Sequence, residues 1–431
     1  MSPIRPSNAF SGRSQVSALT RTVADALGNR DGIPSNESLP AGIVPPGRGL
    51  PPKPLAQNPL VDRLGSWFAP GVSTRDERAA LSSFVAQREA GWGAPVTALT
   101  SEQVPYFEAF RTEKAAALVR FDRHPGEVTE GFVHAAGSVD GQPIEARDLF
   151  WQRWAPLGEP SGKLVVISPG FQETGRNFLE QVQLLNAQGH DVVVMDHQWA
   201  GYSRGNPGGL DRGFGVARDV AAMAAHAQQL ADATYGAKPH EVVLFGNSMG
   251  AGPGVLGALA LNDAGRIQLE GPQMPRGLDG ILQAPFLELR DSVINQGLAF
   301  LGGVPGVKDV ALPSMGLPVL TRDPAAAAKL SQHVVLEGVV ARPQAMRAAT
   351  ADLHELIRSI AGGHGPTGRI AILHGVGDPL ADVGASRKLA GVLGPRAKLL
   401  ELDTANHVLA EEAGVQAEIL GALAWLEDSE G

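Results

Sequence analysis

The 431-residue sequence contains no cysteine, which excludes disulfide bonds, thiolate metal sites and a cysteine nucleophile. A covalent mechanism would therefore have to use Ser, Thr, Asp, Glu or Lys. Aromatic residues are scarce at 5%, whereas apolar residues make up 43% of the chain and charged residues 19%, so most of it can bury a core. We expect a globular protein rather than a coiled coil or a disordered chain.

A basic excess and long apolar runs are also missing. The formal net charge is -9, so no positive field is available to hold nucleic acid or an anionic membrane. No stretch of about 18 apolar residues could cross a bilayer, and the first residues lack the apolar core of a Sec signal. We therefore expect a cytoplasmic protein with no stable membrane anchor and no nucleic-acid partner, while export without a Sec signal stays open.

Proline is distributed unevenly. Ten of the 32 prolines fall within residues 1–60, together with Ser, Gly and Asn, which predicts a disordered tail, although a secretion or docking signal is the alternative. Residues 61–127 become helical in composition, and capping-box patterns such as Thr74-x-x-Glu77 mark helix starts. This second segment predicts a helical N-terminal extension.

From about residue 128 the pattern is one of strands alternating with helices. EGFVHAA and DLFWQRWAP, joined by a turn at Gly141, predict an antiparallel pair. Helical stretches such as ARDVAAMAAHAQQLADATY separate apolar runs, which is typical of parallel strands buried between two helical layers. The predicted fold is α/β, with a doubly wound, mostly parallel sheet formed by residues 128–285 and 368–431. The apolar runs are KLVVIS, HDVVVMD, HEVVLFG, LDGILQ, GRIAILHG and AKLLELD.

The interval 286–367 has no obvious core strand and is longer than a crossover requires. It therefore predicts an inserted helical cap, which should cover the carboxyl edge of the sheet. Its apolar residues, among them Phe286, Leu289 and Met315, could line an acyl-chain pocket or form the core of the cap itself.

The pentapeptide Gly246-Asn247-Ser248-Met249-Gly250 carries the strongest chemical signal. It follows an apolar strand and precedes a helix of small residues, which is the context that a nucleophile elbow needs. The two glycines permit a sharp turn that raises the Ser248 hydroxyl above the sheet edge. The pattern alone is common, but in this context it predicts Ser248 as the nucleophile.

A serine hydroxyl needs a base and an orienting acid, expected downstream in the order Ser, Asp, His. Asp378 follows the strand GRIAILHG, and His407 follows the strand AKLLELD, before a helix expected to begin near Leu409. Both residues therefore lie at the carboxyl edge of the predicted sheet. We predict Asp378 as the orienting acid and His407 as the base.

Each of these two residues has rivals. Asp382 could replace Asp378 but also suits a helix cap, and Asp403 lies too near His407 in the chain to face it comfortably. His374 also ends a strand, but it precedes Asp378 and so breaks the expected chain order.

An oxyanion hole requires two backbone donors. The turn that begins Ser168-Pro169-Gly170 supplies one, for which we choose the Phe171 N–H, with Gln172 as the neighbouring alternative. The N–H of Met249, next to the nucleophile, is the second.

Four stretches carry a family resemblance over residues 130–428. PGFQETGRNF resembles a His-Gly-x-x-Glu-x-x-x-Arg-Tyr oxyanion turn, DHQWAGYSRG a glycine-rich loop, GNSMGA the elbow, and LTRDP a phrase common in the cap. Together they are similar to the α/β-hydrolase superfamily, and within it to the monoacylglycerol lipase and lysophospholipase group, sometimes labelled serine aminopeptidase-like. The sequence departs from that pattern at Pro169 and Asn247, where His is usual, and at Gln198-Trp199-Ala200. These departures put the substrate preference in doubt.

The resemblance implies a serine esterase without metal or cofactor, acting on a small acyl ester, such as a monoacylglycerol or lysophospholipid. Two alternatives stay open. An aminopeptidase of the proline-iminopeptidase type would use acidic cap residues to hold the substrate amine, for which Glu288, Asp291 and Glu337 are available. A hydrolase fold kept as a non-catalytic interaction module is the other.

Overall fold

The computed structural model describes residues 128–288 except 172, 199, 201–202, 204–213 and 239; residues 312–313, 320–321 and 340–341; and residues 343–428 except 404, 410–411 and 413. The predicted tail 1–60, the predicted helical extension 61–127 and much of the predicted cap 286–367 lie outside the described residues.

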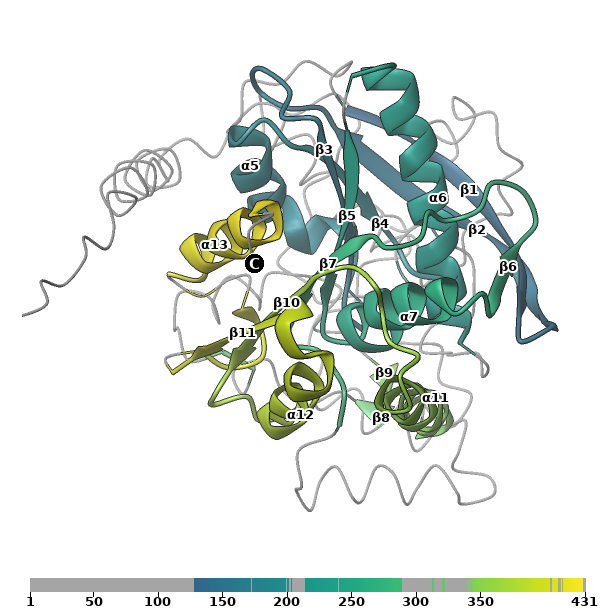
Figure 1. Cartoon of the computed structure of the whole chain (residues 1–431), viewed down its shortest axis with the longest axis vertical. Coiled ribbons are helices and arrows are strands. Elements are labelled where there is room, and N and C mark those ends of the chain that lie inside the picture. The colour runs from purple at the N-terminus through teal and green to yellow at the C-terminus, as the bar shows by residue number, and fades with distance from the viewer. Residues whose placement is uncertain are drawn as a thin grey trace, which may run out of the picture.

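A nine-stranded sheet forms the centre of the described fold, in the order β11-β10-β7-β5-β3-β4-β2-β1-β6 (Figure 1). The six apolar runs of the sequence form its parallel part, and β2 joins that part antiparallel to β4. The predicted α/β class and the mostly parallel sheet are therefore confirmed. The parallel strands are β3 (Lys163–Ser168), β4 (Asp191–Met195), β5 (Glu241–Asn247), β7 (Asp279–Gln283), β10 (Ile370–Gly375) and β11 (Ala397–Leu402).

The predicted antiparallel pair is a long hairpin of β1 (Val128–Val139) and β2 (Gln142–Trp154). Its two-residue turn places Asp140 at φ 52° and Gly141 at φ 73°, the left-handed geometry that an Asp-Gly hairpin turn requires. A register shift beside Gly137 marks a bulge, where a Cβ would lie 2.2 Å from the Gln268 carbonyl oxygen. That oxygen belongs to β6 (Ile267–Leu269), an edge strand antiparallel to β1 that the sequence analysis missed.

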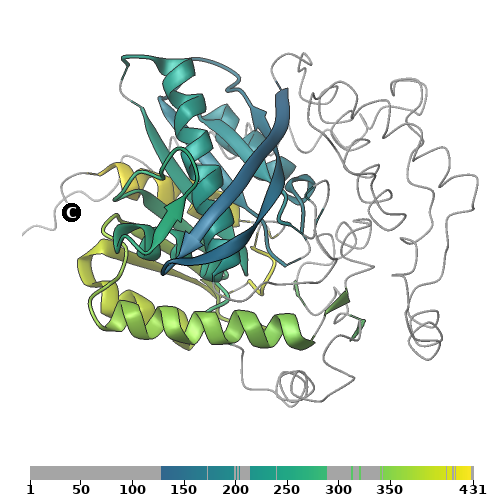
Figure 2. The ribbon, with the colours of Figure 1, turned by 90° about the vertical axis from the view of Figure 1, so that its right-hand side faces the viewer.

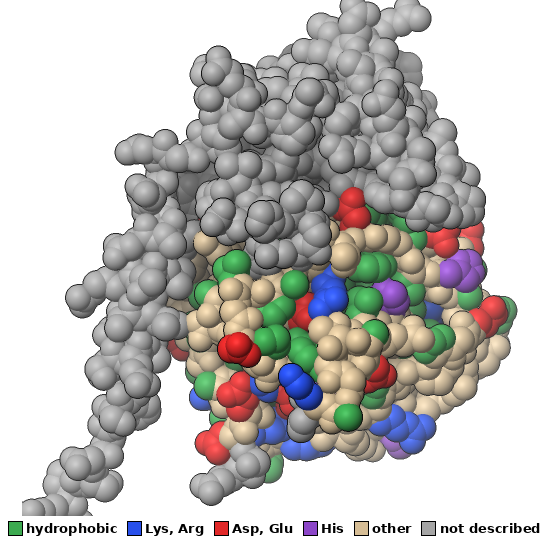
Figure 3. All heavy atoms as spheres, turned by 90° about the horizontal axis from the view of Figure 1, so that it is seen from above, with side chains coloured by type: hydrophobic (Ala, Val, Ile, Leu, Met, Phe, Trp, Pro, Cys, Tyr) green, Lys and Arg blue, Asp and Glu red, His purple; other side chains and the backbone are tan. Residues whose placement is uncertain are grey.

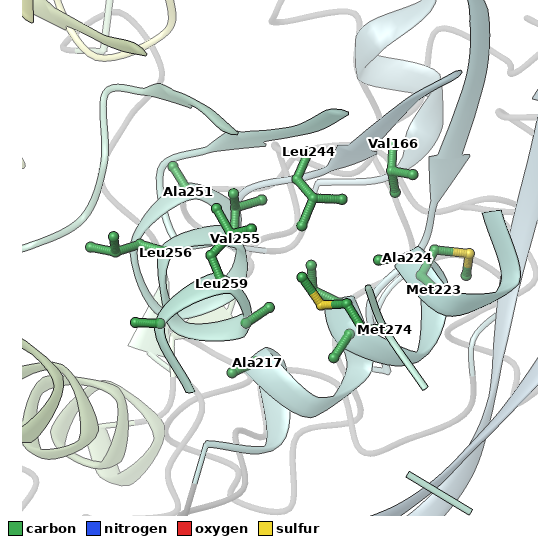
Figure 4. Close-up of a cluster of buried hydrophobic side chains, with 14 of the residues drawn as sticks. Val166, Ala217, Met223, Ala224, Leu244, Ala251, Val255, Leu256, Leu259 and Met274 are labelled. Atoms are coloured by element: carbon green, nitrogen blue, oxygen red, sulfur yellow. The ribbon is translucent and has the colours of Figure 1, made fainter. Parts of the chain in front are cut away.

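Helices cover both faces of the sheet. One face packs against α6 (Gly215–Tyr235), α7 (Gly257–Asp263), α11 (Pro343–Ala361) and α12 (Val383–Leu393). The other packs against α5 (Leu179–Ala187) and α13 (Val415–Glu427). Figure 4 shows the first layer, where Val166 of β3 and Leu244 of β5 lie beside alanine and methionine side chains of α6 and Leu259 of α7. Buried alanines along α6 let that helix approach the strands closely.

The interval predicted as cap leaves and re-enters the sheet between β7 and β10, which are neighbouring strands. Its described residues include the short antiparallel pair β8 (Leu312–Pro313) and β9 (Val340–Ala341). They also include α11, the light-green helix at the lower edge of the fold in Figure 2, which buries Leu353 and Leu356 in the core cluster.

The carboxyl ends of the parallel strands determine where functional loops meet, because loops from one edge of a parallel sheet lie together. The loops after β3, β5, β10 and β11 all leave from this edge. The helix expected near Leu409 begins only at Val415 in the structure, after Gly414 in a left-handed conformation. On the face drawn in Figure 3, acidic and basic side chains of the described residues are interspersed rather than segregated.

Candidate active site

The turn after β5 holds Ser248 in a backbone conformation that non-glycine residues seldom adopt, with φ 51°. A Cβ on Gly246 would lie 2.4 Å from the Gly250 carbonyl oxygen, and one on Gly250 would lie 2.2 Å from the carbonyl oxygens of Ser168 and Pro169. Only glycine fits either position. The strained turn is fixed by the Ser248 N–H, which donates to the Gln283 carbonyl at 2.8 Å.

The structure brings Ser248, His407 and Asp378 together, although they come from three different loops. His407 Nε2 lies 2.8 Å from Ser248 Oγ, and His407 Nδ1 lies 2.7 Å from Asp378 Oδ2. Because a carboxylate only accepts, Nδ1 carries the proton and Nε2 is free to accept the serine hydroxyl proton. All three side chains are buried. This arrangement can activate the serine hydroxyl as a nucleophile.

Asp378 is oriented by its own turn. Its Oδ1 accepts the N–H groups of Leu380 at 2.8 Å and Ala381 at 2.9 Å, which leaves Oδ2 facing His407. Burial alone would raise the pKa of Asp378, but the charge of His407, the nearby His374 ring, and hydrogen bonds from His407 and the Ala381 amide hold that pKa far below its ordinary value. The carboxylate therefore stays ionised.

The electrostatics of His407 follow from that carboxylate. Burial lowers the pKa of His407, but the charge and hydrogen bond of Asp378, with the nearby charge of Glu173, outweigh it and raise the pKa above the ordinary value. The site thus favours the imidazolium that forms when the serine proton is taken up.

The rival residues have other roles in the structure. Asp382 caps α12, where its Oδ1 accepts the Gly384 N–H at 3.0 Å, and Asp403 is exposed on the loop after β11. His374 contacts Asp378 but not Ser248: its Nε2 lies 3.3 Å from Asp378 Oδ2.

The loop that carries His407 is attached to the LTRDP phrase of the sequence. The N–H groups of His407 and Val408 both donate to the Leu320 carbonyl at 3.0 Å. Glu412 Oε1 accepts both the Thr321 hydroxyl at 3.0 Å and the Asn406 N–H at 3.1 Å. Leu320 and Thr321, the described residues of LTRDP, therefore stabilise the histidine loop by hydrogen bonds.

A buried carboxylate joins the loop after β3 to the elbow. Glu173 Oε2 accepts the Gly170 N–H at 2.6 Å and the Asn247 side-chain N–H at 2.8 Å. Burial raises the pKa of Glu173, although both hydrogen bonds oppose that shift. Glu173 lies within the PGFQETGRNF motif, but the sequence analysis assigned it no role. Its partner Asn247 comes from a different loop, and no local sequence pattern indicates that contact.

The two predicted oxyanion donors lie in this region. Phe171 follows the anchored Gly170, and its side chain packs against an apolar cluster of Ala200, Val216 and Met249. The cluster therefore brings Phe171 and Met249 together beside Ser248. The alternative donor Gln172, and Trp199, lie outside the described residues.

Among the described residues, no group of three or more acidic, histidine or cysteine side chains is arranged to hold a metal ion. Within the same part of the chain, no helix combines the length and apolar character needed to cross a membrane.

Comparisons with known proteins place these features in a family. No curated protein sequence matches the chain. The structure of a monoglyceride lipase from Saccharomyces cerevisiae is similar at TM-score 0.51 and 17% identity, over 69% of this chain and 96% of that one. A monoacylglycerol lipase from Paleococcus ferrophilus has TM-score 0.47 and 18% identity, over 66% and 98%. A carboxyl esterase from Bacillus coagulans has TM-score 0.47 and 17% identity, over 69% and 98%.

The yeast structure supports the α/β-hydrolase fold, which agrees with the sheet described above. The family model described as serine aminopeptidase, S33, matches residues 159–413, which is more than half of the chain and includes the elbow, the acid turn and the histidine loop. The chain belongs to this serine aminopeptidase S33 family of hydrolases.

Proposed function

We propose that this hydrolase is a serine esterase that cleaves carboxylic esters through an acyl-enzyme, with lipid-like esters such as monoacylglycerol or lysophospholipid as substrates. The observation that carries the proposal is the chain of contacts from Ser248 Oγ through His407 to Asp378, at 2.8 Å and 2.7 Å, on a strained turn.

In the proposed reaction Ser248 Oγ attacks the ester carbonyl while His407 Nε2 takes its proton. The N–H groups of Phe171 and Met249 stabilise the oxyanion, and the tetrahedral intermediate collapses as His407 protonates the leaving alcohol. Water, deprotonated by His407, then attacks the acyl-enzyme, and the proton returns to Ser248 as the acid is released. Asp378 stabilises the imidazolium in both halves and keeps its own charge.

The surroundings of the nucleophile support an ester with an apolar acyl group. Phe171, Ala200, Val216 and Met249 form an apolar cluster on the oxyanion side. Of the three acids weighed for an amine-binding site, only Glu288 is described, and its carboxylate lies 3.6 Å from Lys388 Nζ in an ion pair. The apolar cluster supports ester cleavage, and Asp291 and Glu337 lie outside the described residues.

A fluorophosphonate probe and a substrate panel test the proposal. The probe should label the wild type at Ser248 and should not label the Ser248→Ala variant. Ser161 lies at the opposite edge of the sheet, so the Ser161→Ala variant should still be labelled at Ser248. The panel compares p-nitrophenyl esters of increasing chain length, a monoacylglycerol, a lysophospholipid and an aminoacyl-nitroanilide. Hydrolysis of the nitroanilide alone would favour the aminopeptidase, and a wild type that neither hydrolyses nor labels would favour a non-catalytic protein.

A further inference from the structure

His374 is a buried polar side chain at the carboxyl end of β10. Side chains alternate along a strand, so His374 points to the same face as Ile370 and Ile372, which is the face covered by α12. The ring is fully buried, and a buried polar group is stable only where it has polar partners. Its Nδ1 is hydrogen-bonded to α12, whereas its Nε2 makes no hydrogen bond of good geometry within the described residues and lies close to the carboxylate of the acid turn.

Ser386 and Asp378 lie at opposite ends of the His374 ring. Nδ1 is 2.7 Å from Ser386 Oγ on α12, and Nε2 is 3.3 Å from Asp378 Oδ2. That carboxylate oxygen also receives His407 Nδ1 at 2.7 Å. Two imidazoles therefore lie near the same oxygen, one from β10 and one from the histidine loop.

The protons can be assigned from donor and acceptor chemistry. A neutral imidazole carries one N–H, and a hydroxyl can donate or accept. A proton on Nδ1 of His374 would leave the Nε2 lone pair facing an ionised carboxylate, which is repulsive. A proton on Nε2 faces the carboxylate favourably, and the Ser386 hydroxyl then donates to Nδ1. The Asp378 carboxylate thus favours the tautomer of His374 with the proton on Nε2, and Ser386 stabilises that tautomer by donating to Nδ1.

Other charged groups near His374 leave this assignment unchanged. Glu401 on β11 is its register neighbour, and its carboxylate is bound by the Arg387 guanidinium at 2.9 Å. Asp378 is held by the amides of its own turn, and His407 approaches it from the histidine loop. The Asp378 carboxylate is thus the acceptor at the Nε2 end of the ring.

We propose that His374 and Ser386 are positioning residues, which together hold Asp378 Oδ2 in the direction of His407. This inference rests on the proposed function, because it assigns the pair a role in the serine hydrolase mechanism. The Asp378 turn amides hold Oδ1 and the two imidazoles hold Oδ2, so the carboxylate cannot rotate without breaking contacts on both oxygens. Without His374, the carboxylate loses one of its contacts at Oδ2, while the hydrogen bond from His407 Nδ1 remains.

The test compares His374→Leu, His374→Gln and Ser386→Ala in the full-length protein. In His374→Leu we expect kcat to fall about tenfold with KM little changed, which is the order expected for loss of one polar contact with a charged group. The acid limb of the pH profile should move to higher pH, because a carboxylate with one donor fewer stabilises the His407 imidazolium more. His374→Gln should restore the wild-type profile, since its amide N–H can take the place of Nε2. Ser386→Ala should shift the limb in the same direction, by less.

The chain offers a matched control at the opposite edge of the sheet. Ser161 Oγ lies 2.7 Å from His190 Nδ1, so this pair has the same chemistry and spacing as Ser386 and His374. Ser161→Ala and His190→Gln should leave kcat and the acid limb unchanged. A His374→Leu variant with wild-type kcat and an unmoved limb would overturn the inference. So would equal losses in His374→Leu and His374→Gln without a limb shift, since these indicate a packing role only.

A second measurement does not depend on turnover. The Nδ1 proton of His407 should give a low-field NMR signal, identified by its absence in His407→Ala. We expect this signal to shift in His374→Leu, to return in His374→Gln and to stay in place in Ser161→Ala. An unshifted signal in His374→Leu refutes the inference even if no ester is a substrate, whereas absent hydrolysis and labelling in the wild type count against the proposed function alone.

Discussion

Replacement of Asn247 by leucine isolates the hydrogen bond that joins the elbow to the loop after β3. Asn247 is buried, and its side-chain N–H donates to Glu173 Oε2 at 2.8 Å. Leucine has the same number and branching of heavy atoms and bulkier methyl groups, so the change removes polar contacts without opening a cavity. Glu173 would then depend more heavily on the Gly170 N–H.

The magnitude follows from two opposed terms. Loss of a hydrogen bond to a charged, buried group costs about 1.5–3 kcal/mol. Asn247 Oδ1 has no hydrogen-bond partner among the described residues, so leucine also removes a desolvation cost of about 1 kcal/mol. The expected net loss in the free energy of unfolding is therefore about 1–2 kcal/mol. Because Gly170 precedes the proposed donor Phe171, kcat should fall as well.

Urea unfolding of a double-mutant cycle measures this coupling. Asn247→Leu should lower the unfolding midpoint at constant m value in the wild type, and should cost less in the Glu173→Gln background, where the acceptor is neutral. Equal costs in the two backgrounds would refute an energetic link between the two side chains. If the Asn247→Leu variant unfolds at the same urea midpoint as the wild type, the hydrogen bond does not contribute to stability.

Four further predictions follow from the same site. Burial lowers the pKa of His407, but Asp378 raises it above the ordinary histidine value, so kcat/KM should fall as pH drops through that higher value. An acid limb of the kcat/KM profile below the ordinary histidine pKa would contradict this effect of Asp378. Asp378→Asn should lower kcat by ~10⁴-fold with KM little changed, because the amide favours the wrong tautomer. Burial raises the pKa of Glu173 in the folded state, so the contribution of this residue to stability is present at acidic pH and is lost as pH rises. The Glu173→Gln variant should therefore have a higher free energy of unfolding than the wild type near neutral pH, but not at low pH. Gly250→Ala should lose activity and about 2 kcal/mol of stability, whereas Gly421→Ala, whose Cβ would meet nothing within 4 Å on α13, should fold and react normally in thermal melts and ester assays.

Much of the sheet could be predicted because strand and helix patterns alternate along this chain. Each parallel strand is a short apolar run between breakers, and the Asp-Gly turn marks the hairpin. The strand β6 was missed because it has only three residues and its pairing with β1 depends on a distant bulge at Gly137. The helix after His407 was placed too early because the segment around Leu409 has an apolar pattern but is followed by the left-handed Gly414.

The predicted nucleophile, base and acid lie together because each follows a strand at the same edge of the sheet, which sequence can indicate. Contacts between loops are different, since no local pattern reports them. The bond from Asn247 to Glu173 spans 74 positions, and His374 could be weighed only as a rival base until its side chain was seen to face α12 and Asp378.

The departures from the family pattern lie on one side of the site. The Pro169 carbonyl accepts from His197 Nε2 at 3.1 Å, and burial lowers the pKa of His197 to about 4, so this histidine is neutral and can donate one proton. Asn247 binds Glu173, and Ala200 packs with Phe171 and the residue after the nucleophile. Because all three positions surround the proposed oxyanion donors, they change what encloses the substrate carbonyl and leave the contacts of the base and its acid intact. Differences in substrate preference from relatives that carry histidine in place of Pro169 and Asn247 should therefore appear in the acyl group that the pocket accepts, with the pH dependence of the base unchanged.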